Sequence, residues 1–570
     1  MLFEDCRLFS KQKKDILVFI AFVLLTSGLF VRTITVRNSG LGELHYRNWF
    51  FVVDTFLYSL DLGKILFIFF LLFSVFSYSK NCKDGVCEII MMYDKPFGIA
   101  AASKTLLLTL LNLSVSVLWF LIEIFYVILV KKSFVPEYLA YMCKAWIAFI
   151  IMPNMLAIIF GFVLSKIRDK KIRILSIMMV TYLFCGNFVS LMHGLSWKTA
   201  IPYEIGNLFS IFVRGTQKAH DLYYIVSAEP GLILKDLMWF FIAMTVYSFL
   251  FVRERRKKVF FMIYPLIATG VICFLLIGGF SSVNSDNESG STFDVWSAPQ
   301  YYYRNHNSID VPAVFSVCEY NIDIGIGFGT SFSVVIIPDI KDLPKYYFTL
   351  YHDYSVKAVK SLNGESLGFK REGDYLIVDN HLGSIDGMII EYRGNSSLYY
   401  STKQGINLPA FFPYYPIAGC YTVFDGQDYY FKLPPVNELS KDNETYFKVS
   451  VRGLDNIFCS LPREEKNLFA GYATSVSILG SEFARQIDYK GYYLVYSALE
   501  ISDKDALNAL IKYSGSKEES DPNGIFLLPY TMYRMQYKNR DILMTSYDRF
   551  ISGQYEPDEE QYSIKRDEER

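Results

Sequence analysis

Histidine is scarce in this chain, with six residues among 570, and none of the six begins the pattern H-E-x-x-H. That pattern places two imidazoles one helical turn apart, so that both can bind a single zinc ion. The three histidines of the C-terminal half, His306, His352 and His381, are widely separated in the sequence. We therefore expect no zinc peptidase activity of that type, no bound metal and no catalytic residue.

A phosphate-binding loop is also missing, because G-x-x-x-x-G-K-[ST] occurs nowhere in the sequence. The backbone N–H groups of such a loop cradle the phosphates of ATP, so this chain is not expected to bind ATP in that manner or to carry any other cofactor. The densest glycine cluster, residues 325–329, alternates with apolar residues, which indicates a close-packed strand and not a nucleotide-binding turn.

Cysteine offers no disulfide framework. Nine cysteines are scattered along the chain, and three of them, Cys318, Cys420 and Cys459, fall in the C-terminal half. An odd number cannot pair completely, so at most one bridge is expected there. Cys82 and Cys87 have neither a second pair nor a nearby histidine, which disfavours a metal site between them.

Long apolar runs are what the sequence does contain. Apolar residues make up 52% of the chain and aromatic residues 17%, above the balance of soluble proteins. A membrane span needs roughly 20 mostly apolar residues, and kinks are expected at Pro153 and Pro265. The predicted spans cover residues 16–34, 57–79, 105–130, 145–165, 174–192, 237–252 and 259–280. The first run lacks a small-x-small cleavage site after it, so it is interpreted as a retained helix and not as a signal peptide.

Lysine and arginine are dense in four segments that fall on alternate sides of these runs. The segments are Arg7 to Lys14, Lys80 to Lys104, Lys166 to Arg173 and Arg253 to Lys258. Basic residues that flank spans stay in the cytoplasm. The pattern therefore predicts a multi-pass protein of the plasma membrane, with a cytoplasmic N-terminus and an extracellular C-terminal half. The net charge of −1 gives no reason to expect a nucleic-acid partner.

Polar residues lie within or beside several spans. Asp61 and Lys64 are three positions apart, hence on one helical face, and are expected to neutralise one another. Glu123 lies inside the third span, where a charge is costly, so it is expected to face other helices or water. Asn154 lies in the fourth span. These residues are interpreted either as a translocation path or, for Glu123, as a buried hydrogen-bond anchor.

The segment between the second and third spans is a short amphipathic stretch with a proline break, GVCEIIMMYDKPFG over residues 85–98. Gly85, Glu88, Pro96 and the later Lys104 match a Gly-x-x-Glu-(apolar) run, a proline turn and a lysine that opens the third helix. In these residues the sequence resembles the ABC type-2 permease family. The serine or threonine usual near the turn is replaced by Phe97, and the basic residue before the glycine is shifted.

This resemblance implies an exporter's permease subunit with a core of about residues 1–253. Such a subunit forms a homodimer or heterodimer among membrane lipids and pairs with a separate ATP-binding subunit on the cytoplasmic side. The substrate is expected to be peptide-like or lipid-like. The contact with the ATPase is expected at Glu88, Met91, Met92, Lys95 and Pro96.

The pattern changes after residue 280, where a Ser/Asn/Gly-rich segment indicates a linker. Phe447 to Arg452 alternates with period two, and Asn363-Gly364 is a strong hairpin signal. Ser502 is expected to cap a helix over 504–513. The predicted division is a six-helix membrane domain at 1–253, an additional helix at 254–280, a linker at 281–300, a mainly β, sandwich-like domain at 301–475, a mixed α/β segment at 476–550 and an acidic disordered tail at 551–570.

Four stretches of this half resemble, in this order, the N-terminal domain of aminopeptidase N-type zinc peptidases. They are Asn363 to Val378, Ile389 to Gly394, Phe412 to Pro416 and Asn467 to Tyr472. That family's H-E-x-x-H and G-x-M-E-N motifs are absent here. The resemblance therefore implies a non-catalytic β domain, unless a neighbouring chain supplies the catalytic part.

Aromatic residues are frequent in the same half, as in Tyr399-Tyr400 and Phe411 to Tyr415. They fit either a binding surface for peptide or glycan, or a packed core. Two functions besides the exporter therefore remain open. One is a membrane receptor or scaffold with a β binding head, and the other is a membrane-anchored peptidase completed by another chain.

Overall fold

The structure is a computed structural model, and the chain divides into two units. Unit 1 contains residues 1–218 and 228–281, and unit 2 contains residues 219–227 and 282–570. The structure describes residues 13–39, 48–83, 96–130, 136–185, 230–251, 255–275, 313–327, 329–396, 399–425, 430–431, 445–516, 521–528, 537–538 and 542–555, with short pieces between 188 and 225.

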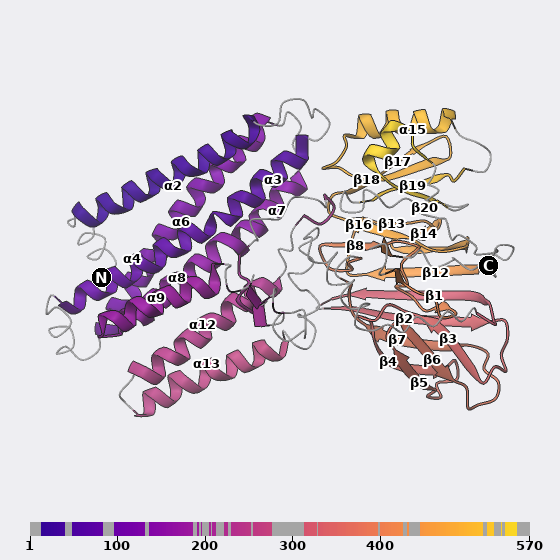
Figure 1. The fold of residues 1–570 in the computed structure, drawn as a ribbon, viewed down its shortest axis with the longest axis horizontal. Coiled ribbons are helices and arrows are strands. Elements are labelled where there is room, and N and C mark those ends of the chain that lie inside the picture. Colours follow the sequence, from indigo (N-terminus) through magenta and orange to yellow (C-terminus); the bar gives the residue numbers. More distant parts are fainter. Residues whose placement is uncertain are drawn as a thin grey trace, which may run out of the picture. The chain divides into compact units, whose positions relative to one another are not determined.

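Unit 1 is helical, and its long helices run side by side (Figure 1). Its elements are α2 (Lys13–Ser39), α3 (Asn48–Asp61), α4 (Gly63–Lys83), α6 (Pro96–Val130), α7 (Pro136–Trp146), the π-helical turn η1 (Ile147–Ile151), α8 (Met152–Ser165), α9 (Lys170–Phe184), α12 (Pro230–Phe251) and α13 (Arg255–Leu275). These helices correspond in order to the seven predicted spans, with α3 and α4 sharing the second and α7, η1 and α8 sharing the fourth.

Four segments of the described residues are long and apolar enough to cross a membrane. They are Val52–Ser79, Lys104–Leu129, Pro136–Ser165 and Leu232–Phe249. Shorter apolar stretches lie in α2, at Phe19–Leu29, and in α13, at Met262–Phe274. The fifth predicted span differs most, because α9 ends at Phe184 after 15 residues, or about 22 Å of helix.

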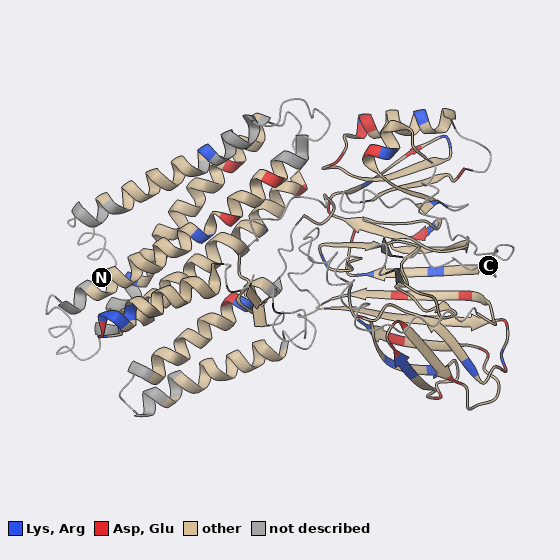
Figure 2. Ribbon diagram, viewed as in Figure 1, with Lys and Arg blue, Asp and Glu red and all other residues tan. Residues whose placement is uncertain are grey.

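The surface of unit 1 is apolar over much of its length. Leu24, Leu129, Leu175 and Phe274, from four different helices, are 66–74% exposed. Figure 2 shows long helical stretches without a charged side chain. Exposed apolar surface on this scale is what hydrocarbon, and not water, accommodates. The apolar helices and apolar surface of unit 1 therefore fit a membrane protein.

Proline shapes two of these helices in different ways. The helix from Pro136 to Ser165 widens into η1 just before Pro153. Proline lacks an N–H group and its ring clashes with the carbonyl four residues earlier, and a π-turn relieves both problems. At Pro96 the predicted break is instead a helix start, since α6 runs without interruption to Val130. Proline suits the first helical turn, where its missing N–H is not needed.

Unit 2 begins with two β-sheets that share one core, as expected for a sandwich-like domain. A seven-stranded sheet has the order β14-β15-β12-β1-β2-β7-β4 and a four-stranded sheet the order β5-β6-β3-β9. The strands are β1 (Val317–Ile326), β2 (Thr330–Pro338), β3 (Lys345–Thr349), β4 (Ser355–Ser361), β5 (Gly368–Glu372), β6 (Tyr375–Asp379), β7 (Met388–Arg393), β9 (Ile417–Ala418), β12 (Thr445–Arg452), β14 (Arg463–Glu465) and β15 (Leu468–Ala473). Burial alternates along β2 and β12, so one face of each strand enters the core.

Two small sheets complete the β region. They are β13-β16-β8 and β10-β11. Their strands are β8 (Gly405–Leu408), β10 (Phe424–Asp425), β11 (Tyr430–Phe431), β13 (Ile457–Cys459) and β16 (Ile478–Ser481). The glycine cluster at 325–329 lies partly at the end of β1 and partly in the turn to β2, where Gly327 N–H donates to the Gly329 carbonyl at 3.1 Å.

A five-stranded sheet follows, in the order β17-β18-β19-β21-β20. It contains β17 (Ala484–Tyr489), β18 (Tyr492–Ser497), β19 (Gly524–Leu528), β20 (Tyr537–Lys538) and β21 (Ile542–Ser546), with helices α15 (Asp503–Ser516) and α16 (Tyr547–Ser552). Along β19, Ile525 and Leu527 pack with the helices, while Phe526 and Leu528 join the core of the β region. The Asp505 N–H donates to Ser502 Oγ at 3.2 Å, which confirms the predicted helix cap.

Candidate functional site

The predicted path residues occupy different levels of unit 1. Asp61 is the last residue of α3, and Lys64 lies in the first turn of α4. Their side chains form the expected ion pair, with exposed fractions of 27% and 22%. The two residues do not lie on one continuous helix, however, because the chain turns at Leu62 between them. The ion pair therefore links the end of α3 to the start of α4 across the turn at Leu62.

Glu123 is the most unusual polar residue of this unit. It lies in the middle of α6 and is fully buried. Its Oε2 accepts a hydrogen bond from Ser59 Oγ of α3 at 2.9 Å, whereas its Oε1 has no hydrogen-bond partner among the described residues. Ser59 Oγ also lies 3.0 Å from the Thr55 carbonyl. Because one hydroxyl carries one proton, Ser59 cannot donate to both acceptors at once, and the carboxyl group is incompletely paired.

Aromatic rings cluster around Phe56 of α3, three residues before Ser59. The Phe56 ring lies 6.2 Å from the rings of Tyr138 and Tyr141 and 6.1 Å from that of Trp146. All four side chains are buried. Rings of this kind present a negative face to a cation. The Oε1 atom of Glu123, which has no hydrogen-bond partner among the described residues, is suited to accept a proton or a hydrogen bond from a ligand.

Asn154 is the second incompletely paired group. It is fully buried in α8, and neither its Oδ1 nor its Nδ2 has a hydrogen-bond partner among the described residues. One turn earlier, the Ile151 carbonyl at the end of η1 accepts from Asn112 Nδ2 of α6 at 3.3 Å. No hydrogen bond connects Glu123 to Asn154 in the described part of unit 1. Asn112 thus links α6, the helix that carries Glu123, to the turn before Asn154, but no hydrogen bond among the described residues joins the two side chains.

Sequence reasoning missed other buried polar residues of α3 and α6, of which Ser59 bonds to Glu123. Ser59, Asn112 and Ser116 are fully or almost fully buried and lie inside apolar runs. The signal that points to them is spacing: Thr55 and Ser59, and Asn112 and Ser116, are four residues apart and so share a helix face. The predicted ATPase contacts Glu88, Met91, Met92 and Lys95 lie outside the described residues, and Pro96 begins α6.

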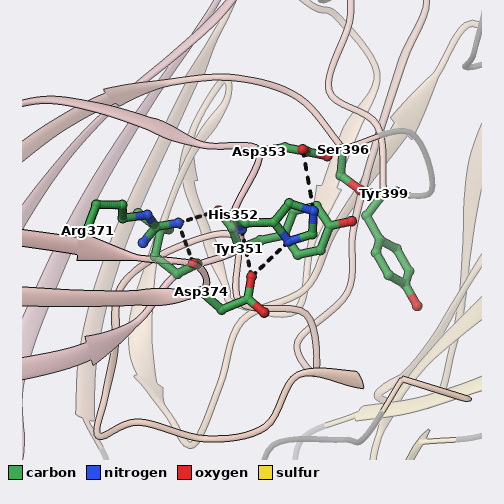
Figure 3. A network of polar contacts seen from close by, with 8 residues as sticks. Tyr351, His352, Asp353, Arg371, Asp374, Ser396 and Tyr399 are labelled. Atoms are coloured by element: carbon green, nitrogen blue, oxygen red, sulfur yellow. Dashed lines mark hydrogen bonds and ion pairs between the residues drawn. The ribbon is translucent and has the colours of Figure 1, made fainter. Parts of the chain in front are cut away.

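Unit 2 contains one polar network built around a histidine (Figure 3). His352 Nδ1 and its backbone N–H lie 2.9 Å and 2.8 Å from Asp374 Oδ1, and its Nε2 lies 3.5 Å from Asp353 Oδ1. Arg371 Nη2 donates to the carbonyls of Leu350 and Tyr351, each at 2.6 Å. The network ties the β5–β6 hairpin to the loop after β3.

Neither ring nitrogen of His352 is directed at a shared metal position, because each faces a carboxylate oxygen. His381 is exposed, and His306 lies outside the described residues. Within the described ranges, no group of three or more His, Cys, Asp or Glu side chains is arranged to hold a metal ion. His352 is therefore interpreted as a structural residue.

The aromatic residues of unit 2 are largely core residues. Tyr399, Tyr400, Phe411, Phe412, Tyr414 and Tyr415 are all at most 3% exposed. Tyr399 packs on Phe412 with ring centroids 4.4 Å apart. For these residues the prediction of a packed core is confirmed and that of a binding surface is wrong. The aromatic residues at 301–303 lie outside the described residues.

Comparison with known proteins gives a partial similarity to zinc peptidases. No family model matches the sequence, and no curated protein matches it. Among solved structures, the M1 zinc metallopeptidase from Deinococcus radiodurans matches with a TM-score of 0.27 and 11% identity, over 41% of this chain and 60% of that chain. A mutant of that enzyme bound to a Tyr-Ser-Ala substrate matches with a TM-score of 0.26 and 12% identity, over 41% of this chain and 61% of that chain.

The chain thus spans about 60% of the length of the solved structures it matches. The similarity is distant and partial, and it does not carry the peptidase's activity to this chain.

Proposed function

We propose that this chain is the transmembrane permease subunit of an ABC exporter, which pairs with a separate ATPase and moves a peptide-like or lipid-like substrate. The observation that carries the proposal is Glu123, a fully buried carboxyl group in a unit of apolar helices, with one oxygen that has no hydrogen-bond partner among the described residues. Buried polar groups are normally paired, and charged residues inside membrane spans mark substrate or ion pathways.

Contacts at one end of unit 1 support the proposed topology. Lys104 Nζ donates to the Ser77 carbonyl at 2.6 Å, and Arg173 Nη1 donates to Ser79 Oγ at 3.0 Å. Residues of the second and third basic segments therefore meet at the same end of α4, as two cytoplasmic segments should. Figure 2 shows further basic residues near the start of α9. In this topology the N-terminus is cytoplasmic and unit 2 is extracellular.

A receptor that binds through its aromatic residues is less well supported, because the aromatic residues of unit 2 named above are buried in its core. In the proposed complex, the ATPase supplies all nucleotide binding, and the permease is a homodimer or heterodimer in the lipid bilayer.

The first test is whether a nucleotide-binding partner accompanies the chain. The tagged chain is isolated from its native membranes in mild detergent and exposed to a photoreactive ATP analogue. We expect the label on a co-purifying polypeptide and not on this chain, together with vanadate-sensitive ATP hydrolysis. Intact, folded chain without any nucleotide-labelled partner would contradict the permease proposal.

Replacement of Glu88 and Lys95 by alanine tests the proposed docking stretch. We expect ATP hydrolysis in the purified complex to fall at least about ten-fold, because a lost interface contact of 1.4 kcal/mol already changes binding ten-fold. The matched control is Lys341→Ala, which removes a half-exposed lysine of unit 2. Unchanged hydrolysis in the double variant would mean that the ATPase docks elsewhere.

A further inference from the structure

A short segment of the loop between α9 and α12 belongs to unit 2, although its sequence neighbours on both sides belong to the membrane domain. Residues 219–227 group with the C-terminal unit. Within them, Leu222, Tyr223, Tyr224 and Ile225 are all at most 5% exposed. A segment of a membrane loop is therefore part of the folded interior of unit 2.

The first half of this segment is bonded to the five-stranded sheet. Tyr223 is fully buried, and its hydroxyl donates to the Leu527 carbonyl in β19 at 2.8 Å. Ser497 Oγ, at the end of β18, donates to the Leu222 carbonyl at 2.7 Å. The Tyr223 ring also belongs to the main hydrophobic core of unit 2. This part of the segment is held by both hydrogen bonds and apolar packing.

The second half is bonded to the β region that precedes that sheet. Gln404 Nε2 donates to the Tyr224 carbonyl, and the Tyr224 ring lies 4.5 Å from the Tyr400 ring. Thr402 Oγ1 lies 3.5 Å from the Tyr224 hydroxyl. Four consecutive residues thus contact both the β region and the five-stranded sheet of unit 2.

The backbone of Ile225 indicates that the docked conformation is specific. Its φ is +62° and its side chain is 2% exposed. A β-branched residue rarely adopts positive φ, because its side chain then crowds the backbone. Such a conformation persists only where the surrounding structure enforces it. A loosely placed loop would relax to an extended conformation.

We propose that residues 222–225 form a docking clip that fastens unit 2 to the membrane domain independently of the linker after α13. Only four residues, 226–229, separate Ile225 from Pro230 at the start of α12. Five backbone steps span at most about 18 Å in any conformation. On the other side, 37 residues, 276–312, separate the end of α13 from Ala313, where the described C-terminal part of unit 2 begins. The clip, and not the linker, therefore limits how far unit 2 moves from α12.

Through the clip, a displacement of α12 is transmitted directly to unit 2. A displacement of α12 beyond the reach of residues 226–229 pulls on β18 and β19 through Ser497 and Leu527. The same connection requires the loop between α9 and α12 to lie on the same side of the membrane as unit 2. This inference does not depend on transport, so its test is separate from that of the exporter proposal.

The test is to cut the covalent linker and ask whether unit 2 stays attached. A site for a specific protease is inserted between residues 285 and 295 of the full-length chain, and membranes containing the protein are digested. We expect most of unit 2 to sediment with the membranes. In Tyr223→Ala, which removes both the ring and the hydrogen bond, we expect at least a ten-fold larger fraction of unit 2 in the supernatant.

Two further variants keep the outcome interpretable. Tyr472→Ala alters a tyrosine of unit 2 that is 66% exposed and should retain unit 2 as the wild type does. If Tyr223→Ala does not fold, Ser497→Ala combined with Gln404→Ala weakens the clip from the side of unit 2 and should increase release. Release of most of unit 2 from the membranes once the linker of the otherwise unchanged chain is cut would overturn the proposal. Equal retention of unit 2 with and without the clip substitutions would also overturn it.

Discussion

Alanine at Gly161 is expected to leave little folded protein in the membrane. A Cβ atom at this position of α8 would lie 2.3 Å from Ser74 Cβ and 2.9 Å from the Leu71 carbonyl oxygen of α4. Real Cβ atoms do not approach backbone so closely, so α4 and α8 would have to separate. Small residues permit this kind of close helix contact in membranes. Overpacking of a tight contact costs about 1–3 kcal/mol and occasionally more.

The matched controls are Gly28→Ala in α2 and Gly270→Ala in α13, where an added Cβ meets no atom within 4 Å. Alanine there should be neutral or stabilising by up to about 1 kcal/mol, because glycine is the weaker helix former. The measurement is thermal unfolding of purified protein in detergent, together with the monodisperse yield. A melting curve of Gly161→Ala that superimposes on the wild type would show that α4 and α8 do not pack as described.

Replacement of Glu123 by leucine is expected to stabilise the fold while it abolishes function. Removal of an unsatisfied buried polar atom avoids a penalty of about 1–3 kcal/mol. Functional sites often retain such a penalty, so activity and stability change in opposite directions. We expect an unchanged or higher melting temperature and at least a ten-fold loss of coupled ATP hydrolysis in the complex with the ATPase.

The same pair of measurements separates the two interpretations of Glu123. If the residue were a hydrogen-bond anchor, Glu123→Leu would remove the acceptor of Ser59 and lower the melting temperature, while hydrolysis per folded complex would stay constant. Ser114→Ala is the control, because Ser114 lies on the same helix with an exposed hydroxyl that contacts only the Leu110 carbonyl of its own turn. That variant should change neither quantity.

The features of the fold that depend on local pattern could be predicted from the sequence. Apolar runs predicted the helices of unit 1, period-two alternation predicted β12, and Ser502 predicted the start of α15. Each of these signals arises from residues close together in the chain, such as the side-chain period of a strand or the bond of a cap. The paired Asp61 and Lys64 are likewise neighbours in sequence.

The features that escaped prediction depend on distant contacts or on small differences in backbone energy. The Ser59–Glu123 bond joins residues 64 positions apart, and the Tyr223–Leu527 bond joins residues 304 positions apart. No local pattern encodes either contact. The widening at η1 and the uninterrupted start of α6 show two prolines with different outcomes. Proline at a helix start is favourable and inside a helix is not, and one sequence alone does not reveal where the helix begins.

Thiol labelling tests the proposed topology, in which the helical unit spans the membrane and unit 2 lies outside the cell. Cys318 in β1 is exposed, whereas Cys459 in β13 is buried. Burial raises the pKa of the Cys459 thiol to about 12, so the reactive thiolate is scarce at neutral pH. Cys459 therefore serves as an internal control that labels only in unfolded protein.

Intact cells are treated with a membrane-impermeant maleimide, and the modified cysteines are identified by mass spectrometry of the peptides that carry them. In the proposed topology, Cys318 is labelled to the same extent in intact and in broken cells, while Cys459 stays unlabelled in both until the protein is denatured. Labelling of Cys318 only after the cells are broken would place unit 2 in the cytoplasm and rule this topology out.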